Sequence, residues 1–162
     1  MRFDLSENRR FSYRVGGLAI HKGKVLLHRA EFDDFWVLPG GSCEFNEESH
    51  QALSRELNEE LNATVKVTSL LWVVENFFAY DGKFVHELGL YYSFDFVSTS
   101  EKFYESKKFE GTEIHPKTKK PFKLYFEWFS FDELANLSIK PNFLKTRLLQ
   151  LPESVERVVQ RE

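Results

Sequence analysis

The sequence predicts an α/β fold in a single domain that covers residues 1–162. Segments rich in aromatic and β-branched residues alternate with polar turns, and one segment has the leucine spacing of a helix. Hydrophobic residues make up 42% of the chain and charged residues 29%, which is typical of a globular protein rather than a disordered or membrane protein. No internal repeat or linker divides the chain, so we expect one core, filled in part by the 17 phenylalanines.

Three strands are expected before the helix. Residues 11–20 and 25–29 have the composition of strands and are separated by a turn that contains glycine. A short strand is expected at residues 36–38, followed by a turn that contains Gly40 and Gly41. Glycine lets the backbone approach a neighbour closely, so a carbonyl or amide of this turn is free to meet an ion or a phosphate.

The helix follows this turn. Leu53, Leu57 and Leu61 repeat every four residues and should face the core. Asn46 is the expected N-cap, and Asn62 is expected to end the helix, since asparagine often adopts the left-handed conformation found there.

A long antiparallel ribbon is expected next. Residues 65–80 and 83–96 are rich in aromatic and β-branched residues, and the Asp81-Gly82 pair between them is a strong signal for a two-residue hairpin turn. With that turn, Asn76 lies opposite Glu87.

Three more elements are expected towards the C-terminus. Residues 98–120 are polar and rich in lysine, and we expect them to form a loop. Residues 122–131 have the composition of a strand, and residues 142–151 are expected to form a short helix after a proline.

The helix carries an unusual concentration of carboxylates. Glu56 and Glu60 are one turn apart, and Glu59 lies three residues from Glu56. Like charges at these spacings destabilise a helix, so a bound cation would explain them, and oxygen ligands favour Mg²⁺ or Mn²⁺ over zinc. Arg55 can reach Glu59 or fold back towards Glu47, and so orient a carboxylate.

This segment resembles the Nudix box, the signature of the Nudix (MutT-like) hydrolase family. In the box, Gly, five residues, Glu, seven residues, Arg-Glu, an aliphatic residue, any residue, Glu-Glu, any residue, Gly and an aliphatic residue follow in order. The matching residues are Gly41, Glu47, Arg55, Glu56, Leu57, Glu59 and Glu60. Asn62 and Ala63 depart from the pattern, but neither change removes a metal ligand.

The resemblance implies a fold and a metal site. The fold would be an α/β/α sandwich with a mixed β-sheet, with a core over about residues 11–150. Mg²⁺ or Mn²⁺ would be held by Glu56, Glu59 and Glu60, with the Gly40 carbonyl as a further ligand. Arg55, Glu56 and Glu59 are the residues expected to take part in catalysis.

The resemblance also implies hydrolysis of a phosphoanhydride bond. The metal would neutralise charge on phosphoryl oxygens and lower the pKa of the attacking water. Glu56 could be the general base, or a later carboxylate could be, as in some Nudix enzymes. Glu110 and Glu113 are the candidates in this chain, and ordinary surface charge is the alternative for both.

Substrate-binding residues are harder to assign. Asn76 and Glu87 could line a pocket or simply satisfy each other on the ribbon. Arg29 could meet a substrate phosphate or lie exposed at a strand end. Tyr80 could stack on a base, as in relatives that cleave diadenosine polyphosphates, or only pack, whereas Ala79 stands where relatives that cleave ADP-ribose often have proline.

Composition limits the partners. A net charge of −3 gives no reason to expect nucleic-acid binding, and no apolar run at the start resembles a signal peptide, so we expect a cytoplasmic protein that does not bind membranes. Both a monomer and a homodimer fit the sequence. The single Cys43 excludes an internal disulfide, and neither it nor the five histidines have the context of a catalytic thiol or a zinc site.

The function expected is therefore that of a metal-dependent hydrolase acting on a nucleoside diphosphate linked to another group, such as a dinucleoside polyphosphate, a nucleotide sugar or a nucleoside triphosphate. The alternative is a nucleotide-binding or sensor module that keeps the fold without turnover. Its usual mark would be loss of Glu56, Glu59 or Glu60, and all three are present. A purely structural role for the acidic helix leaves the coincidence of the glycine turn, Arg55 and the glutamates unexplained.

Overall fold

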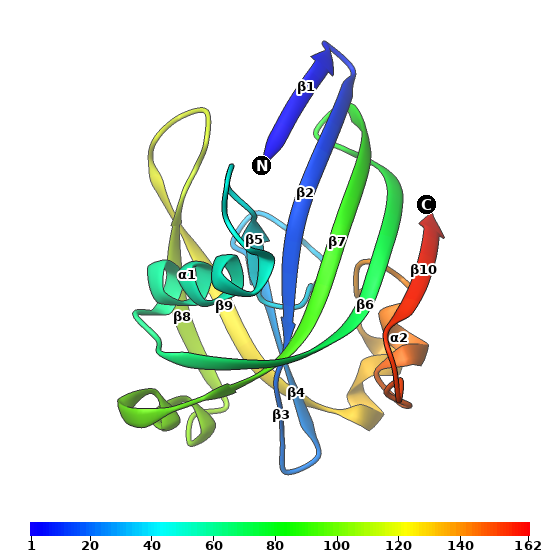
Figure 1. Ribbon diagram of the computed structural model, residues 1–162. Coiled ribbons are helices and arrows are strands. Elements are labelled where there is room, and N and C mark those ends of the chain that lie inside the picture. The colour runs from blue at the N-terminus through cyan, green and yellow to red at the C-terminus, as the bar shows by residue number, and fades with distance from the viewer.

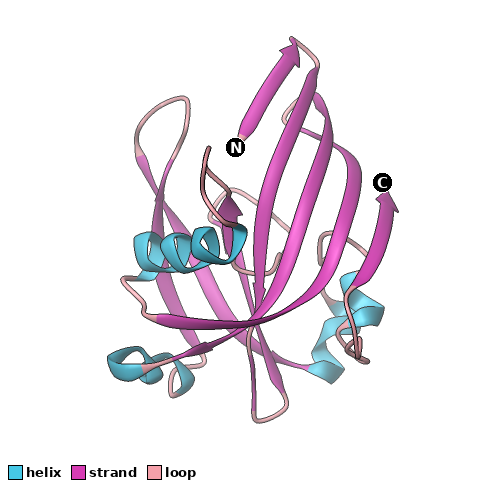
Figure 2. Cartoon of the chain, in the orientation of Figure 1, coloured by secondary structure: helices cyan, strands magenta, loops and turns pink.

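The computed structural model describes residues 1–162 as two β-sheets with helices on both sides (Figures 1 and 2). The first sheet has the strand order β1 (Arg2–Ser6), β2 (Arg9–Leu18), β7 (Lys83–Phe96), β6 (Val65–Tyr80) and β10 (Glu156–Arg161), and β5 (Gly40–Ser42) also pairs with β2. The second sheet has the order β3 (Ile20–His21), β4 (Lys24–Ala30), β9 (Pro121–Ser130) and β8 (Lys108–Ile114). The first sheet is mixed, because β2 runs parallel to β7 and β10 runs parallel to β6, while the other pairs are antiparallel.

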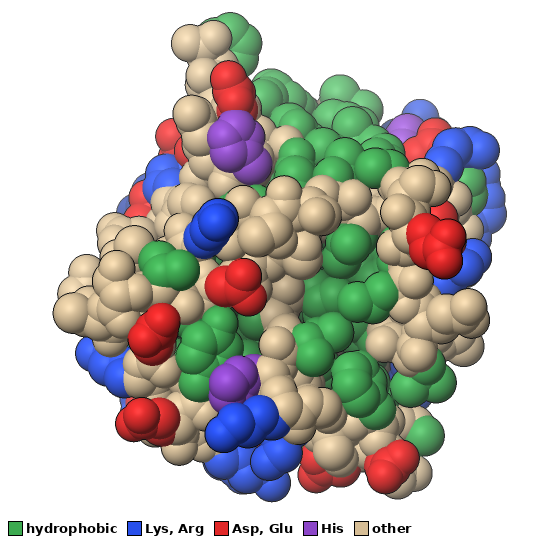
Figure 3. Space-filling view, turned by 60° about the horizontal axis from the view of Figure 1, so that its bottom comes forward, with side chains coloured by type: hydrophobic (Ala, Val, Ile, Leu, Met, Phe, Trp, Pro, Cys, Tyr) green, Lys and Arg blue, Asp and Glu red, His purple; other side chains and the backbone are tan.

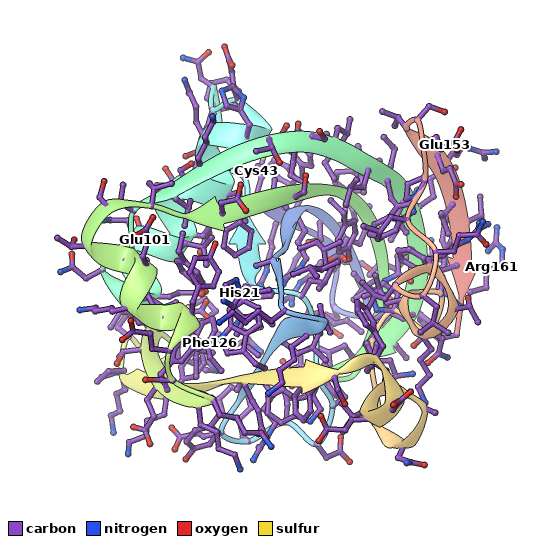
Figure 4. The ribbon with its side chains drawn as sticks, turned by 90° about the horizontal axis from the view of Figure 1, so that it is seen from below. His21, Cys43, Glu101, Phe126, Glu153 and Arg161 are labelled. Atoms are coloured by element: carbon purple, nitrogen blue, oxygen red, sulfur yellow. The ribbon has the colours of Figure 1, made fainter.

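The helical segments lie on the two flanks of the sheets (Figure 1). They are α1 (Ser49–Leu61), the short 3₁₀ helices η1 (Ser98–Tyr104) and η2 (Phe131–Asn136), and α2 (Leu144–Arg147). Under α1, Leu53 packs in a cluster with Phe96 and Phe126, and on the other flank Leu144 packs in a second cluster with Trp72. Figure 4, seen from below, shows side chains filling the space between the sheets, with Phe126 among them. The predicted α/β class with a mixed sheet is confirmed.

The ribbon between β6 and β7 has the predicted ends and register. Asp81 and Gly82 form its turn with φ angles of 50° and 71°, and a two-residue hairpin of this kind needs positive φ at both positions. Asn76 pairs with Glu87, as expected from that turn.

Helix α1 ends as predicted but begins differently. Asn62 adopts the left-handed conformation, with φ of 53°, and its N–H donates to the Asn58 carbonyl at 2.8 Å. The N-cap is Glu48 rather than Asn46, because Asn46 itself has a φ of 61° and lies in the preceding loop. The carboxylate of Glu47 organises that loop by accepting the Glu44 N–H at 2.9 Å.

The segment at residues 98–120 is not a loop throughout, and this prediction was wrong. It contains η1 and the strand β8, which forms the edge of the second sheet and pairs with β9. Charged residues are common on edge strands because one side of the strand faces solvent and the charges hinder edge-to-edge aggregation. Because of its charged residues, the sequence of β8 resembles that of a polar loop.

Other differences involve short or peripheral elements. The helix expected at residues 142–151 is present only as the four residues of α2. The strand expected at residues 36–38 is absent, and Trp36 and Val37 form only isolated β-bridges. Strands β1 and β10 were not expected. All five residues of β1 are exposed, so the strand has no buried face from which hydrophobic alternation could reveal it.

The surface is of mixed character. Figure 3 shows hydrophobic side chains near the middle of one face, with charged side chains mainly towards its edges. None of the helices has the length and apolar character needed to cross a lipid bilayer.

Candidate functional site

The glycine turn packs the chain tightly against α1. Gly40 has a φ of 148°, and a Cβ at this position would collide with the Val15 carbonyl oxygen. A Cβ on Gly41 would overlap the carboxylate of Glu56. Only glycine therefore lets β5 lie directly beside the acidic helix, and this contact holds the Glu56 side chain at the turn.

Arg55 organises the carboxylates around it. Its Nε and one Nη donate to both oxygens of Glu47 at 2.7 and 3.0 Å, and the same Nη donates to the Ser42 carbonyl at 2.9 Å. The other Nη donates to Glu59 at 3.1 Å and to Glu56 at 3.2 Å. The hydrogen bonds that Arg55 donates to Glu47 are the main reason that the pKa of Arg55 is raised. The two contacts expected for Arg55, with Glu59 and with Glu47, are thus present together.

Glu60 is a buried carboxylate without a partner. Only 5% of the residue is exposed, and neither of its side-chain oxygens has a hydrogen-bond partner. The nearest basic nitrogen, Nδ1 of His28, is 3.9 Å away, but burial lowers the pKa of His28 to about 3, so this contact is not an ion pair at neutral pH. Burial, together with Glu113 and Glu56, raises the pKa of Glu60 well above its ordinary value.

Glu56 and Glu113 share this environment. Burial raises the pKa of each of them, and the charge of Glu113 adds to the rise at Glu56. Glu113 reaches the site from β8, and it lies on the same face of the strand as Gly111, where a Cβ would collide with the Glu60 backbone oxygen. We call Glu56, Glu60 and Glu113 together the acidic end.

The donor set at the acidic end suits a hard divalent cation. Carboxylate oxygens are the ligands that Mg²⁺ and Mn²⁺ prefer, and the charged form of a buried, unpartnered carboxyl group such as Glu60 is unfavourable unless a proton or a cation compensates it. As it stands, the structure contains no group of three or more His, Cys, Asp or Glu side chains arranged to hold a metal. Glu59 is paired with Arg55 and its side chain is 59% exposed, so it would have to leave Arg55 to join Glu56 and Glu60.

A cavity of about 1030 Å³ opens beside the acidic end. Gly40, Gly41 and Glu113 line it, together with aromatic side chains that include Phe35 and Phe78. This volume is at the upper limit for sites that hold small ligands or cofactors.

The floor of the cavity is polar. Glu87 and Asn76 line it, and Ser12 pairs with Glu87 in the sheet, so the three residues form one row across β2, β7 and β6. We call Ser12, Glu87 and Asn76 the polar floor. The predicted pair of Asn76 and Glu87 therefore lies in the cavity, and no hydrogen bond joins its two members.

The remaining predicted residues are placed as follows. Arg29 lines the cavity, with its guanidinium over the rings of Trp36 and Tyr125 at 5.4 and 5.0 Å. Tyr80 also lines the cavity, and its hydroxyl donates to Asp33 at 3.1 Å.

Of the two carboxylates considered as a later base, the structure separates one from the site. Glu110 pairs with Lys123 at 3.2 Å, is exposed and does not line the cavity. Glu113 lines the cavity. It is three residues from Glu110 on β8, and residues three apart on a strand face opposite sides of the sheet.

Arg14 is a site residue that the sequence did not reveal. It lines the cavity and donates to the Leu38 carbonyl at 3.3 Å. Burial opposes its charge, but nearby groups that include Glu87 and Glu60 raise its pKa overall. It therefore lies between the polar floor and the acidic end. The one available signal was a charged residue flanked by Tyr13 and Val15 inside the strand.

Tyr91 was missed as well. It lines the cavity and is 2% exposed, and its ring lies where a Cβ on Gly16 or Gly89 would be. Glycines inside strands often mark such close approaches, and this was the available signal.

Comparisons with known proteins agree with this architecture. A family model for the NUDIX domain matches residues 11–148. An RNA pyrophosphohydrolase from Ruthia magnifica subsp. Calyptogena magnifica is 38% identical over 60 residues, which cover 37% of this chain and 34% of that protein. The match thus spans about a third of the curated relative.

Two solved structures share the fold. A mutator MutT protein from Bacillus halodurans superimposes with a TM-score of 0.61 at 20% identity, covering 93% of this chain and 89% of that one. An ADP-ribose pyrophosphatase from Streptococcus suis gives a TM-score of 0.53 at 16% identity, covering 92% of this chain and 98% of that one. At these identities the likeness concerns the fold.

Proposed function

The chain belongs to the Nudix hydrolase family, and on that premise we propose that it is a divalent-metal-dependent hydrolase of phosphoanhydride bonds. Its substrate would be a nucleoside diphosphate linked to another group, such as a dinucleoside polyphosphate, a nucleotide sugar or a nucleoside triphosphate. The observation that carries this proposal is Glu60, a buried carboxylate without a partner, close to Glu56 and to Glu113, which lines a large cavity.

Four groups of this chain would hold the metal, Mg²⁺ or Mn²⁺. They are the carboxylates of Glu56, Glu59 and Glu60 and the carbonyl of Gly40. When bound, the metal would neutralise charge on the phosphoryl oxygens and lower the pKa of the attacking water. Arg55 would keep Glu47 and the start of α1 in place while Glu59 is released to the metal.

The reaction needs a base and a way to hold the substrate phosphates. The oxygen of a water molecule forms a bond to phosphorus, the bridging P–O bond breaks, and the proton of the water passes to a carboxylate. Glu113 is a candidate to accept it, since burial raises its pKa above the ordinary value for a carboxyl group and it lies close to Glu60 while coming from β8 instead of α1. Glu56 is the alternative base. Arg14 and Arg29 line the cavity and can pair with phosphate oxygens.

Chromatographic detection of the hydrolysis products, which are nucleotides together with sugar phosphates, phosphate or pyrophosphate, is the direct test. The purified protein would be given Mg²⁺ or Mn²⁺ and a panel of dinucleoside polyphosphates, nucleotide sugars, ADP-ribose and nucleoside triphosphates. Glu60→Gln is the test variant. Glu153→Gln is the matched control, because Glu153 is exposed, forms no ion pair and lies near β10, on the far side of the molecule from α1 (Figures 1 and 4).

We expect turnover of at least one class in the wild type and in Glu153→Gln, and its loss in Glu60→Gln. Equal turnover in all three proteins would show that Glu60 is not part of the site. Absence of turnover across the panel, with nucleotide still bound, would favour a binding module.

A further inference from the structure

The polar floor has the form of a recognition surface. Ser12, Glu87 and Asn76 are paired across three neighbouring strands, and side chains of residues paired in this way lie on the same face of a sheet. That face is the one that lines the cavity, since both Glu87 and Asn76 border it.

These groups are buried but have unused hydrogen-bonding capacity. Glu87 is 8% exposed and Asn76 is 6% exposed. The hydroxyl of Ser12 donates to one carboxylate oxygen of Glu87 at 3.2 Å, whereas the amide oxygen of Asn76 has no partner. Glu87 forms no ion pair, although Arg14 is near enough for the two charges to interact. A buried polar group without a partner is unfavourable, so a ligand that supplies the missing partners would be bound selectively.

The surroundings suit a flat ring. Phe78 follows Asn76 by two residues on β6 and so lies on the same face, and it lines the cavity together with Phe35 and Tyr80. Phe35 and Tyr80 themselves meet edge to face, with their ring centroids 6.3 Å apart. Aromatic side chains of this kind bind nucleobases by stacking.

We infer that the polar floor reads a nucleobase with the hydrogen-bonding edge of guanine. This inference rests on the proposed function, because it names the substrate class of the same cavity. Guanine presents two adjacent donors, N1–H and the 2-amino group, next to the acceptor O6. Glu87 can accept N1–H and one hydrogen of the 2-amino group as two parallel donors, and the unpartnered amide oxygen of Asn76 can accept the second hydrogen of the 2-amino group.

Other bases fit the polar floor less well. Adenine and cytosine place a ring nitrogen that accepts hydrogen bonds beside their amino group, and a carboxylate has nothing to donate to it. Uracil has one N–H between two carbonyls. Hypoxanthine keeps N1–H and O6 but lacks the 2-amino group. The expected order of affinity is therefore guanine, then hypoxanthine, then adenine.

Equilibrium binding of GDP, IDP and ADP tests this order without requiring turnover. The three nucleotides share the same diphosphate and ribose, so differences report on the base. In the wild type we expect GDP to bind about 10- to 100-fold more tightly than ADP, which is the usual range for one good bidentate contact, with IDP between them. Equal affinities for GDP and ADP, or affinity for none of the three, would overturn the inference, and this comparison needs no variant.

The variant Glu87→Gln sharpens the test. Glutamine offers one donor and one acceptor, so it can pair with the edge of adenine and not with both donors of guanine. We expect the ratio of GDP to ADP affinity to fall at least about 10-fold. Asp95→Asn is the matched control, because Asp95 is an exposed carboxylate on the same strand β7, away from the cavity. It should leave the ratio unchanged, and thermal unfolding would show that both variants fold.

The two proposals fail in different ways. Metal-dependent turnover with equal use of GTP and ATP would keep the hydrolase and overturn the base preference. Selective binding of GDP without turnover of any nucleotide would keep the base preference and overturn the hydrolase. A ratio of GDP to ADP affinity that stays unchanged in Glu87→Gln would overturn the assignment to Glu87.

Discussion

The acidic end and the polar floor of the cavity both bury polar groups without partners, but they differ in charge. At the acidic end, carboxylates from α1 and β8 crowd together, and burial raises the pKa of each of them. The polar floor combines one carboxylate with a hydroxyl and an amide. Crowded carboxylates need a cation, whereas a mixed row of donors and acceptors needs a ligand with a complementary pattern. Under the two proposals above, the acidic end carries out the chemistry and the polar floor recognises the base.

This division has a kinetic consequence. Changes at the acidic end should lower turnover for every substrate by a similar factor. Changes at the polar floor should alter the relative affinity for different bases and leave the chemical step largely intact.

The largest loss is expected for Glu60→Gln. Removing this carboxylate takes away a charge that would hold the metal, and turnover should fall by about 10³-fold. In chelator, the same variant should unfold at a temperature equal to or above that of the wild type, because a neutral amide replaces a buried, unpartnered carboxyl group whose ionisation is unfavourable. Turnover and thermal unfolding measure the two effects. Unchanged turnover in Glu60→Gln would contradict the proposal that the acidic end carries out the chemistry.

The next largest effect should separate two carboxylates of β8. Glu113→Gln should lower turnover by about 10²-fold if Glu113 is the general base, while Glu110→Gln should change it by less than about twofold, since Glu110 lies on the opposite face and pairs with Lys123. Rates measured at saturating substrate compare them. Equal effects of the two substitutions would exclude Glu113 as the general base.

Gly41→Ala tests the close contact between the glycine turn and α1. The new methyl group would displace the Glu56 carboxylate, and we expect a loss of roughly 50-fold in turnover, since small displacements of catalytic groups have effects of this size. The control is Gly23→Ala, where nothing lies within 4 Å and the φ of 73° adds only backbone strain. That control should lower stability by about 1 kcal/mol and leave turnover intact.

Arg55→Lys should have a moderate effect. A lysine can replace one contact of the guanidinium but cannot bridge Glu47, Glu59 and the Ser42 carbonyl at once. We expect about a 10-fold fall in turnover, with a higher metal concentration needed for half-maximal rate. Measuring the rate at increasing metal concentrations gives both the maximal turnover and the metal concentration for half-maximal rate. Full activity with lysine would mean that a point charge is sufficient and that the fork geometry is unimportant.

Tyr80→Phe should have the smallest effect. The substitution removes the hydroxyl that donates to Asp33 at 3.1 Å and keeps the ring. We expect KM to change by less than about 3-fold and kcat to stay the same, because a partly exposed hydrogen bond contributes little. A large fall in kcat would place Tyr80 in the chemistry instead of at the wall of the cavity.

The two ends also differ in how far the sequence reveals them. On α1 the functional residues are close in sequence, so spacing alone predicted their grouping and the helix end at Asn62. The pair of Asn76 and Glu87 could be predicted as well, because a two-residue turn determines the register of the ribbon.

Other features depend on contacts between distant segments. Arg14 and Tyr91 join the site only because β2 pairs with β5 and β7, and Glu113 joins it because a segment that looks like a polar loop forms an edge strand. No pattern within a single segment predicts which distant strands will pair. The start of α1 was also predicted wrongly. Asn46 lies in the loop before the helix, where the Glu47 carboxylate accepts the Glu44 N–H, and the N-cap is Glu48.

Binding of Mn²⁺ to chelator-stripped protein, followed by the electron paramagnetic resonance signal of the free ion, tests the central claim most directly. The wild type and Glu153→Gln should remove Mn²⁺ from solution with the same affinity, and Glu60→Gln should bind it at least about 10-fold more weakly. Equal affinity in all three proteins would contradict the assignment of the buried Glu60 carboxylate to a metal site.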